Sequence, residues 1–127
     1  MAITTHFKIK RMSPLLLVAD IKRSIEFYTN ELGFEVDFRY EDFYAGIIKD
    51  GYSIHLKQSG YSMNERKNKK NNEDLNIIFS VNGIEDLYEE LSHKPVTFIQ
   101  SLRNMPYGNE FYITDPDGNL IGFIEEP

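Results

Sequence analysis

Three histidines and a run of mixed aromatic and acidic residues are the features of this sequence that could do chemistry. The chain has no cysteine, so a thiolate nucleophile, a disulfide and a cysteine-based zinc site are all excluded. His55 lies in the run DGYSIHL, whereas His6 lies near the start of the chain and His93 follows a predicted helix. A single imidazole needs further groups beside it to act as a general base or to hold a metal ion.

The second feature is the segment GFEVDFRYEDFYAG, in which aromatic rings alternate with carboxylates. We expect Phe34 and Val36 to pack in the core, because they have the spacing of one face of a strand. The segment holds four further rings, more than one short hairpin usually buries: Phe38, Tyr40, Phe43 and Tyr44. A flat cationic ligand could stack on such rings and gain about 0.5–2 kcal/mol per cation–π contact.

These side chains must be positioned by two halves of the chain that resemble each other. Residues 15–32 and 78–91 each combine a short β-rich run, a turn residue and an amphipathic helix. DGYSIHL at 50–56 likewise resembles DGNLIGF at 117–123, since each is a glycine-containing turn followed by a strand. The repeat predicts two βαβββ modules of the same architecture.

The fold class that follows is α+β, with the two modules forming a curved mixed sheet and the helices on its outer face. We expect a single domain over residues 1–127, because a chain of this length leaves little room for a second one. Its parts are a first module at 12–58, a polar linker loop at 59–73 and a second module at 74–125. The opening residues, in which Phe7 alternates with Ile9, are long enough to add an edge strand.

The two predicted helices have recognisable ends. Asp20 and Asn82 can each accept hydrogen bonds from the unpaired amides of a first turn, and Gly33 provides a left-handed stop after the first helix. One face of each helix is apolar and should pack against the sheet: Ile21, Ile25, Tyr28 and Leu32 in the first, and Ile84, Leu87 and Leu91 in the second.

The sheet face turned away from the helices, which we call the trough face, is the expected ligand site. Ile54 and Leu56 belong under the first helix, so strand alternation turns His55 towards the trough face. The same alternation in the second module places Glu110 and Tyr112 there. The floor is apolar and consists of Leu15, Leu17, Ile78, Leu120 and Ile124. A concave surface with a few polar groups between apolar walls is typical of a small-molecule site.

Composition excludes several classes of function. Apolar residues make up 41% of the chain and charged residues 27%, as in a folded, soluble domain. The net charge of −6 argues against nucleic acid or an anionic membrane as a partner and is compatible with a cationic one. No stretch approaches the roughly 18 apolar residues of a membrane span and no leader peptide opens the chain, so we expect a cytoplasmic protein.

Several motifs, in this order, resemble those of the vicinal oxygen chelate superfamily, which contains glyoxalases, extradiol dioxygenases, epimerases and bleomycin resistance proteins. They are the strand end VADI, FYTNELGF and the closing DPDGNLIGFIEE, and with the paired modules they cover residues 12 to 126. Enzymes of that superfamily hold a divalent metal with His, Glu or Gln from four strands. Matched to this chain, those four places fall on Ser13, His55, Asn76 and Gly122.

Only His55 among these four is a usual ligand of a first-row metal ion, since Gly122 has no side chain and Ser13 and Asn76 are poor partners. An open catalytic site normally needs about three protein ligands. We therefore expect no metal, no other cofactor and no catalytic residue. His55 is interpreted as a polar residue of the trough face, hydrogen-bonded to Asn76 or Ser13, with a direct ligand contact as its alternative role.

Within the superfamily, three segments resemble the bleomycin resistance proteins: LGFEVDFRYEDFYAG, DLNIIFSVNGIEDLYEEL and PYGNEFYITDPDGNLIGFIEE. Those proteins are metal-free dimers that sequester a cationic glycopeptide antibiotic. The resemblance implies that Phe38, Tyr44 and Tyr107 stack on the planar part of the ligand, with Phe43 as a substitute for Tyr44. Tyr107 stands where that family usually has tryptophan. Pro14 matches the proline at which the N-terminal arm of those proteins crosses to the partner subunit.

The sequence therefore favours a metal-free protein that sequesters a cationic, aromatic-bearing small molecule, as in bleomycin-type resistance, in clefts of a homodimer. The predicted ligand-binding residues are Phe38, Tyr44, Phe43, Tyr107, His55, Glu110 and Tyr112. One alternative is an enzyme of the glyoxalase, dioxygenase or isomerase type, which needs a bound metal or a metal-free mechanism with His55 and Tyr112. Another is a module without a ligand that acts through its dimer surface.

Overall fold

The computed structural model describes residues 5–59 and 75–127. Within them, two four-stranded sheets share one topology, with the strand orders β1-β4-β3-β2 and β5-β8-β7-β6. The first sheet consists of β1 (Leu15–Val18), β2 (Glu35–Tyr40), β3 (Tyr44–Lys49) and β4 (Tyr52–Gln58). The second consists of β5 (Ile77–Ser80), β6 (Thr97–Met105), β7 (Gly108–Thr114) and β8 (Leu120–Glu125).

The two sheets repeat each other in strand direction and register. β1 pairs in parallel with β4, where Leu15 lies beside His55, and β5 pairs in parallel with β8, where Ile78 lies beside Gly122. The other neighbouring strands are antiparallel. Each sheet is therefore mixed, and with a helix after its first strand the arrangement confirms the predicted α+β fold.

Each first strand is followed by a helical segment. α1 (Ile21–Glu26) continues directly into a π-helical segment, η1 (Phe27–Glu31), and α3 (Ile84–Ser92) follows β5. Asp20 caps α1 as predicted, because its carboxylate accepts hydrogen bonds from the amides of Lys22 and Arg23. Gly33, with a φ of 76°, follows the end of η1 in the left-handed conformation that its glycine predicts.

The prediction that Asn82 caps the second helix is wrong. The N-cap of α3 is Gly83, which has no side chain to offer. Glu125 of β8 takes over this role, because its carboxylate accepts hydrogen bonds from the amides of Gly83 and Ile84, at 3.1 and 3.0 Å. The cap of α3 therefore comes from a strand 41 residues further along the chain, not from the residues next to the helix.

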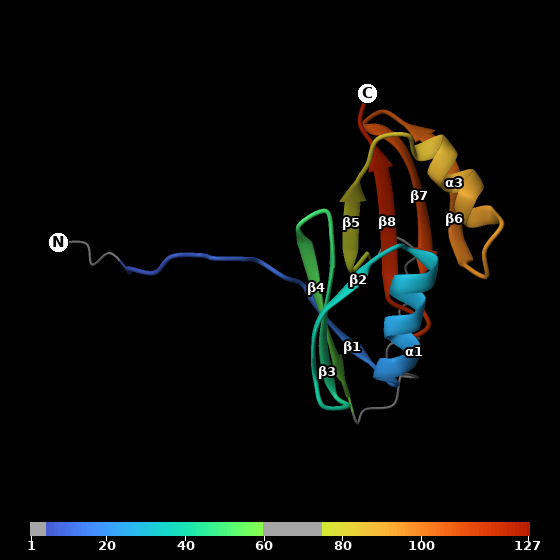
Figure 1. Ribbon diagram of the computed structural model, residues 1–127. Coiled ribbons are helices and arrows are strands. Elements are labelled where there is room, and N and C mark those ends of the chain that lie inside the picture. The colour runs from blue at the N-terminus through green and yellow to red at the C-terminus, as the bar shows by residue number, and fades with distance from the viewer. Residues whose placement is uncertain (1–4, 60–74) are drawn as a thin grey trace.

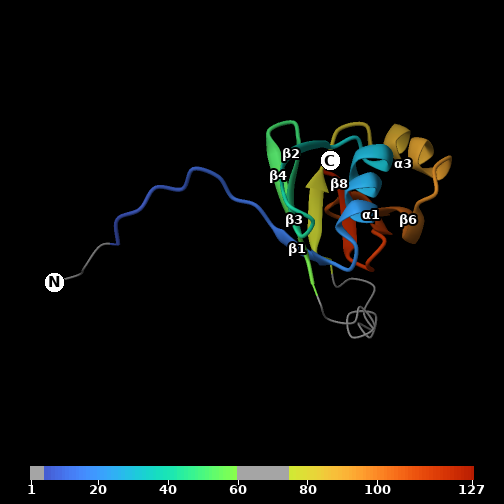
Figure 2. The same ribbon diagram turned by 60° about the horizontal axis from the view of Figure 1, so that its bottom comes forward.

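The two halves share one hydrophobic core. α1 and α3 lie on the same side of the molecule in both views (Figures 1 and 2). A chain of ring contacts crosses between the halves: the ring centroids are 5.9 Å apart for Tyr28 and Phe34, 6.1 Å for Phe34 and Phe79, and 5.5 Å for Phe79 and Phe123. The predicted apolar helix faces pack in this core, since Ile21, Ile25, Tyr28, Ile84 and Leu91 are all buried there.

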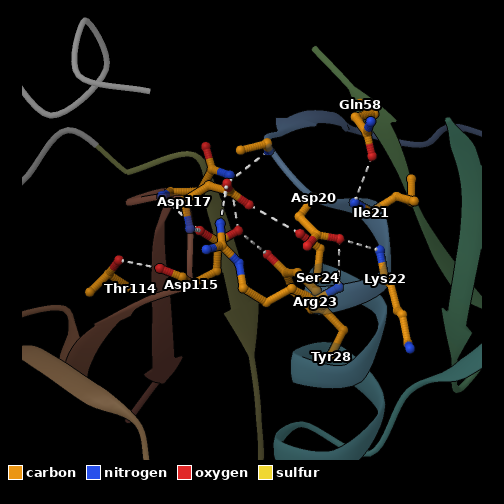
Figure 3. Close-up of polar contacts among 12 residues, drawn as sticks. Asp20, Ile21, Lys22, Arg23, Ser24, Tyr28, Gln58, Thr114, Asp115 and Asp117 are labelled. Carbon is orange, nitrogen blue, oxygen red and sulfur yellow. Dashed lines mark hydrogen bonds and ion pairs between the residues drawn. The ribbon is translucent and has the colours of Figure 1, made fainter. Parts of the chain in front are cut away.

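A second connection between the halves is polar (Figure 3). Asp117, in the loop between β7 and β8, is only 1% exposed. Its carboxylate accepts hydrogen bonds from the amide of Ala19 at 2.9 Å, the guanidinium of Arg23 at 3.0 Å and the hydroxyl of Ser24 at 3.0 Å. The DPDG turn of the second half thus binds the start of α1 in the first.

Burial of the same loop shifts two pKa values. Burial raises the pKa of the Asp115 carboxyl above its usual value, although hydrogen bonds from Asn119, Tyr28 and the amide of Asp117 stabilise its charged form. Burial also raises the pKa of Tyr28 well above its usual value, and the nearby Asp115 carboxylate adds to that shift. Tyr28 therefore remains a neutral donor to Asp115, at 2.8 Å.

Residues 5–14 form an extended arm that leads away from the rest of the chain (Figures 1 and 2). The expected edge strand with Phe7 and Ile9 is absent from these residues, and both side chains are exposed. Arg11, which lies 3.0 Å from Asp37 of β2, forms an ion pair between the arm and the first sheet. Apart from Ser59, the linker expected at 59–73 lies outside the described residues. None of the described helices has the length and apolar character needed to cross a membrane.

Candidate functional site

The trough face of the first sheet is formed as strand alternation predicts. Leu16 and Leu56 are 3% and 0% exposed and pack in the core, whereas Leu15 is 50% exposed. His55 lies beside Leu15 in register and beside Gly46 of β3, so these residues share the face opposite the core.

Three rings gather on this face. Phe38 of β2 and Tyr44 of β3 are stacked, with centroids 6.0 Å apart and planes at 20°. His55 of β4 stands edge-on to both, at 5.2 Å from Phe38 and 5.5 Å from Tyr44. The Tyr44 hydroxyl and His55 Nδ1 are 2.8 Å apart, so a hydrogen bond fixes how these two rings are oriented. We call Phe38, Tyr44 and His55 the aromatic cluster.

A β-bulge in β2 directs Phe38 into the aromatic cluster. Val36 pairs with Ile47, but Phe38 pairs with Gly46, so β2 has one extra residue between the two pairs. Ile47 is buried in the core, while Gly46 lies beside His55. Val36 and Phe38 therefore lie on opposite faces of the sheet, although uninterrupted alternation would place them on the same face.

The bulge and the position of β2 also correct one expectation about the core. Phe34 is buried, as predicted, but Val36 is 48% exposed. β2 is the edge strand of its sheet and all six of its residues are exposed, Val36 among them. The prediction of core packing is therefore confirmed for Phe34 and wrong for Val36.

Two other predictions concern Phe43 and His55. Phe43 contacts Tyr40, with ring centroids 5.5 Å apart, so the structure places it in a separate pair and not in the aromatic cluster. The expected hydrogen bond from His55 to Asn76 or Ser13 is wrong, because its partner is Tyr44. The Ser13 hydroxyl is instead hydrogen-bonded to that of Ser53, and the Asn76 side chain accepts one from the amide of Leu120 at 2.9 Å.

The four positions that correspond to metal ligands in the superfamily do not provide a donor set. Ser13 and Asn76 are hydrogen-bonded within the protein, and His55 is the sole imidazole of the four. A Cβ at Gly122 would lie 3.0 Å from Leu75 Cδ1, tighter than most real contacts. Among the described residues, no three His, Cys, Asp or Glu side chains are grouped so that they could hold a metal ion. The side chains at these four positions do not fit a divalent metal.

The second sheet presents a polar counterpart on its own trough face. Glu110 and Tyr112 lie there as predicted, while Phe111 and Ile113 are buried in the core. Arg103 of β6 donates to Glu110 Oε2 from Nε and Nη2, at 2.8 and 2.6 Å, and the Tyr112 hydroxyl donates to the same oxygen at 3.0 Å. The guanidinium carbon lies 5.6 Å from the Tyr112 ring centroid. We call Arg103, Glu110 and Tyr112 the polar cluster.

The polar cluster holds Tyr112 as a neutral hydrogen-bond donor. Burial raises the pKa of its phenol above the usual value, and the hydrogen bond to Glu110 adds to the shift. Arg103 was missed by sequence reasoning because β6 and β7 are paired with register irregularities on either side of Gln100. Its place seven residues before Glu110, across a short hairpin, was the signal that could have indicated a cross-strand ion pair.

Tyr107 lies in the turn between β6 and β7 and is 48% exposed. The structure of one chain therefore brings Phe38, Tyr44 and His55 together and brings Glu110 and Tyr112 together. Tyr107 lies close enough to Tyr112 to contribute to the rise in the pKa of the Tyr112 phenol.

Comparison with known sequences identifies relatives over nearly the whole chain. The model of the Glyoxalase/Bleomycin resistance protein/Dioxygenase superfamily matches residues 6–123. The bleomycin resistance protein of Geobacillus stearothermophilus is 29% identical over 130 aligned positions, which cover 89% of this chain and 94% of that protein. A bleomycin resistance protein of Staphylococcus aureus gives the same values.

Solved structures share the fold. The bleomycin-binding protein from bleomycin-producing Streptomyces verticillus, complexed with copper(II)-bleomycin, has a TM-score of 0.73 at 22% identity and covers 96% of this chain and 100% of its own. TnmS3, an antibiotic binding protein from Streptomyces sp. CB03234, has a TM-score of 0.68 at 18% identity, with the same coverage. Because the family model matches all but the two ends, this chain belongs to the Glyoxalase/Bleomycin resistance protein/Dioxygenase superfamily.

Proposed function

We propose that this protein is a metal-free binding protein that sequesters a planar, cationic small molecule of the bleomycin type without transforming it. The observation that supports this most is the aromatic cluster, in which Phe38 is 38% exposed and held in place by Tyr44 and His55. Ordered, partly exposed rings are suited to stacking on a flat ligand. The relatives named bleomycin resistance proteins suggest the class of ligand.

The proposed ligand contacts divide by chemistry. Phe38, Tyr44 and Tyr107, with Phe43 as a further candidate, would supply stacking surfaces. The remaining candidates, His55, Glu110 and Tyr112, would supply polar contacts on the two trough faces. A protein that captures its ligand without transforming it needs no general base and no activated nucleophile. It needs surfaces for stacking and groups for hydrogen bonding, and the two clusters present both.

We further propose that the protein is a homodimer with the ligand clefts at its interface. Leu15 and Ile78, on the trough faces, are 50% and 59% exposed, and Phe7, Ile9 and Met12 of the arm are also exposed. Several large apolar side chains exposed on one chain are typical of a surface that a partner covers. Sedimentation velocity should give about twice the chain mass of 14.9 kDa, and a single-chain mass at micromolar concentration would contradict the dimer.

The experiment that tests the function is a titration with bleomycin, metal-free and copper-loaded, followed by tyrosine fluorescence, because the chain has no tryptophan. Tyr107→Ala should weaken binding by about 1–3 kcal/mol if the ring is a central anchor. Tyr52→Ala is the matched control, since Tyr52 is 77% exposed and pairs with Lys49, away from the aromatic cluster. An unresponsive spectrum across micromolar bleomycin would contradict the proposal. A stoichiometric divalent ion in protein purified without chelator would favour the enzyme alternative.

A further inference from the structure

The two oxygens of the Glu110 carboxylate have different surroundings. Oε2 accepts hydrogen bonds from Arg103 Nε, Arg103 Nη2 and the Tyr112 hydroxyl. Oε1 accepts none from residues 5–59 or 75–127. Each oxygen of an ionised carboxylate has about two acceptor sites, so the unused capacity of this side chain is at Oε1.

Glu110 is only 4% exposed, yet Oε1 is not closed off. In the described part of the chain, no fully buried side-chain oxygen or nitrogen lacks a hydrogen-bond partner. Because Oε1 has no such partner, it must remain in contact with the space outside the protein. Strand register shows towards which face the Glu110 side chain points. Glu110 lies beside Ile124 and Arg103, on the face opposite the buried Phe111.

Arg103 holds the carboxylate in this orientation. It is the register partner of Glu110 across β6 and β7, and its Nη1 also donates to Gln100 Oε1 at 3.3 Å. With Arg103 and Tyr112 both donating to Oε2, the carboxylate cannot exchange its two oxygens without breaking three hydrogen bonds. The polar cluster is therefore preorganised, with one acceptor atom left for a ligand.

From this geometry we infer that Glu110 Oε1 accepts a hydrogen bond from an amine or amide N–H of the ligand, and that Arg103 is the positioning residue for this contact. The inference rests on the proposed function and specifies the chemical group that the second sheet recognises. Because the ion pair with Arg103 already offsets the charge of Glu110, the contact selects for a hydrogen-bond donor more than for positive charge. A ligand that places a carboxylate or carbonyl oxygen next to Glu110 Oε1 would bring two acceptors together with no hydrogen to share, which disfavours its binding.

Glu110→Gln tests the contact. The three donors around Oε2 require the single amide oxygen of glutamine at that place, so its NH₂ group takes the place of Oε1. The substitution thereby converts the acceptor into a donor. We expect the variant to bind bleomycin at least about tenfold more weakly than the wild type. Glu89→Gln, an exposed position on α3, makes the same charge change away from both trough faces and should bind like the wild type.

A second readout uses the wild-type protein alone. In protein labelled with ¹³C at the glutamate side-chain carboxyls and assigned through bonds, the Glu110 signal should shift on addition of bleomycin and the Glu89 signal should not. For Arg103, the Arg103→Met variant should bind more weakly, and Arg103→Lys should restore part of the loss, because an ammonium still donates to Oε2 but cannot donate twice in a fixed plane.

The possible outcomes separate this inference from the proposed function. If the wild type binds bleomycin while the Glu110 signal stays in place and folded Glu110→Gln binds as tightly, the inference is wrong and the proposed function stands. If the wild type gives no fluorescence response at all, the proposed function is wrong and the inference fails with it. Should Glu110→Gln not fold, as judged by circular dichroism, the carboxyl shift in the wild type decides.

Discussion

The ring of Phe38 lies against a residue that has no side chain. Gly46 is its partner across β2 and β3, and a Cβ at Gly46 would overlap three atoms of the ring. In the second sheet Tyr112 is the partner of Gly122, where a Cβ would lie 3.4 Å from the Tyr112 ring. On each trough face, an aromatic ring thus lies over a glycine of the neighbouring strand, and the first of these positions leaves no room for a methyl group.

Gly46→Ala should therefore displace Phe38 from the aromatic cluster. We expect a loss of about 1–3 kcal/mol in the free energy of unfolding, measured with urea, because the added carbon overpacks this contact. Bleomycin binding should weaken about as much as in Phe38→Ala. In the double variant Phe38→Ala/Gly46→Ala, binding should be no weaker than in Phe38→Ala alone, since the ring through which Gly46 acts is gone. A further loss in the double variant would assign Gly46 a separate role.

For individual residues, the sequence was enough to predict which side chains belong to the trough faces, but not which of them contact one another. The sequence indicates His55 and Tyr112 as trough-face residues through simple alternation, which both strands follow. Phe38 depends on a bulge at Asp37, and the partner of Glu110 depends on irregular pairing between β6 and β7. Bulges are decided by the fit of neighbouring strands, so the hydrophobic pattern of one strand does not contain them.

At the scale of elements, α3 depends on a strand for its first turn. Glu125 of β8 accepts hydrogen bonds from two amides at the start of the helix, which lower the pKa of its carboxyl. Local signals predicted the cap and the stop of the first helical segment, Asp20 and Gly33, because both act within a few residues of the chain. They did not predict the cap of α3 or the π-helical geometry of η1, which require knowledge of the packed structure.

Glu125→Gln should destabilise the protein at neutral pH and much less in acid. The folded pKa of Glu125 lies below the usual value of 4.5, so its charge contributes stability above that value and the contribution disappears as the pH falls through the folded pKa. The melting temperatures of wild type and variant should therefore differ at pH 7, and the difference should shrink as the pH falls below 4.5 and through the folded pKa. Glu89→Gln is again the control, and should show little difference over this range. A gap that stays constant with pH would show that the carboxylate charge is not its source.

At the scale of the whole molecule, the two trough faces keep their relative position only if the halves stay joined. Apolar contacts provide part of this connection through Phe34 and Phe79. The other part is Asp117, which is buried and binds three groups of the first half (Figure 3). Apolar contacts tolerate small shifts, whereas hydrogen bonds to a buried carboxylate have fixed lengths and directions. Asp117 is therefore expected to fix the orientation of the halves as well as to stabilise them.

Asp117→Ala tests this connection. The variant removes the acceptor for the Ala19 amide and the Ser24 hydroxyl, and Ser24 is fully buried, so we expect a loss of about 2–4 kcal/mol in the free energy of unfolding by urea. Asp117→Asn keeps one acceptor oxygen and should recover part of this loss. Asp42→Ala, whose fully exposed carboxylate is 3.7 Å from Arg39, is the control and should cost well under about 1 kcal/mol. If Asp117→Ala were no more costly than that control, the apolar core alone would hold the halves together.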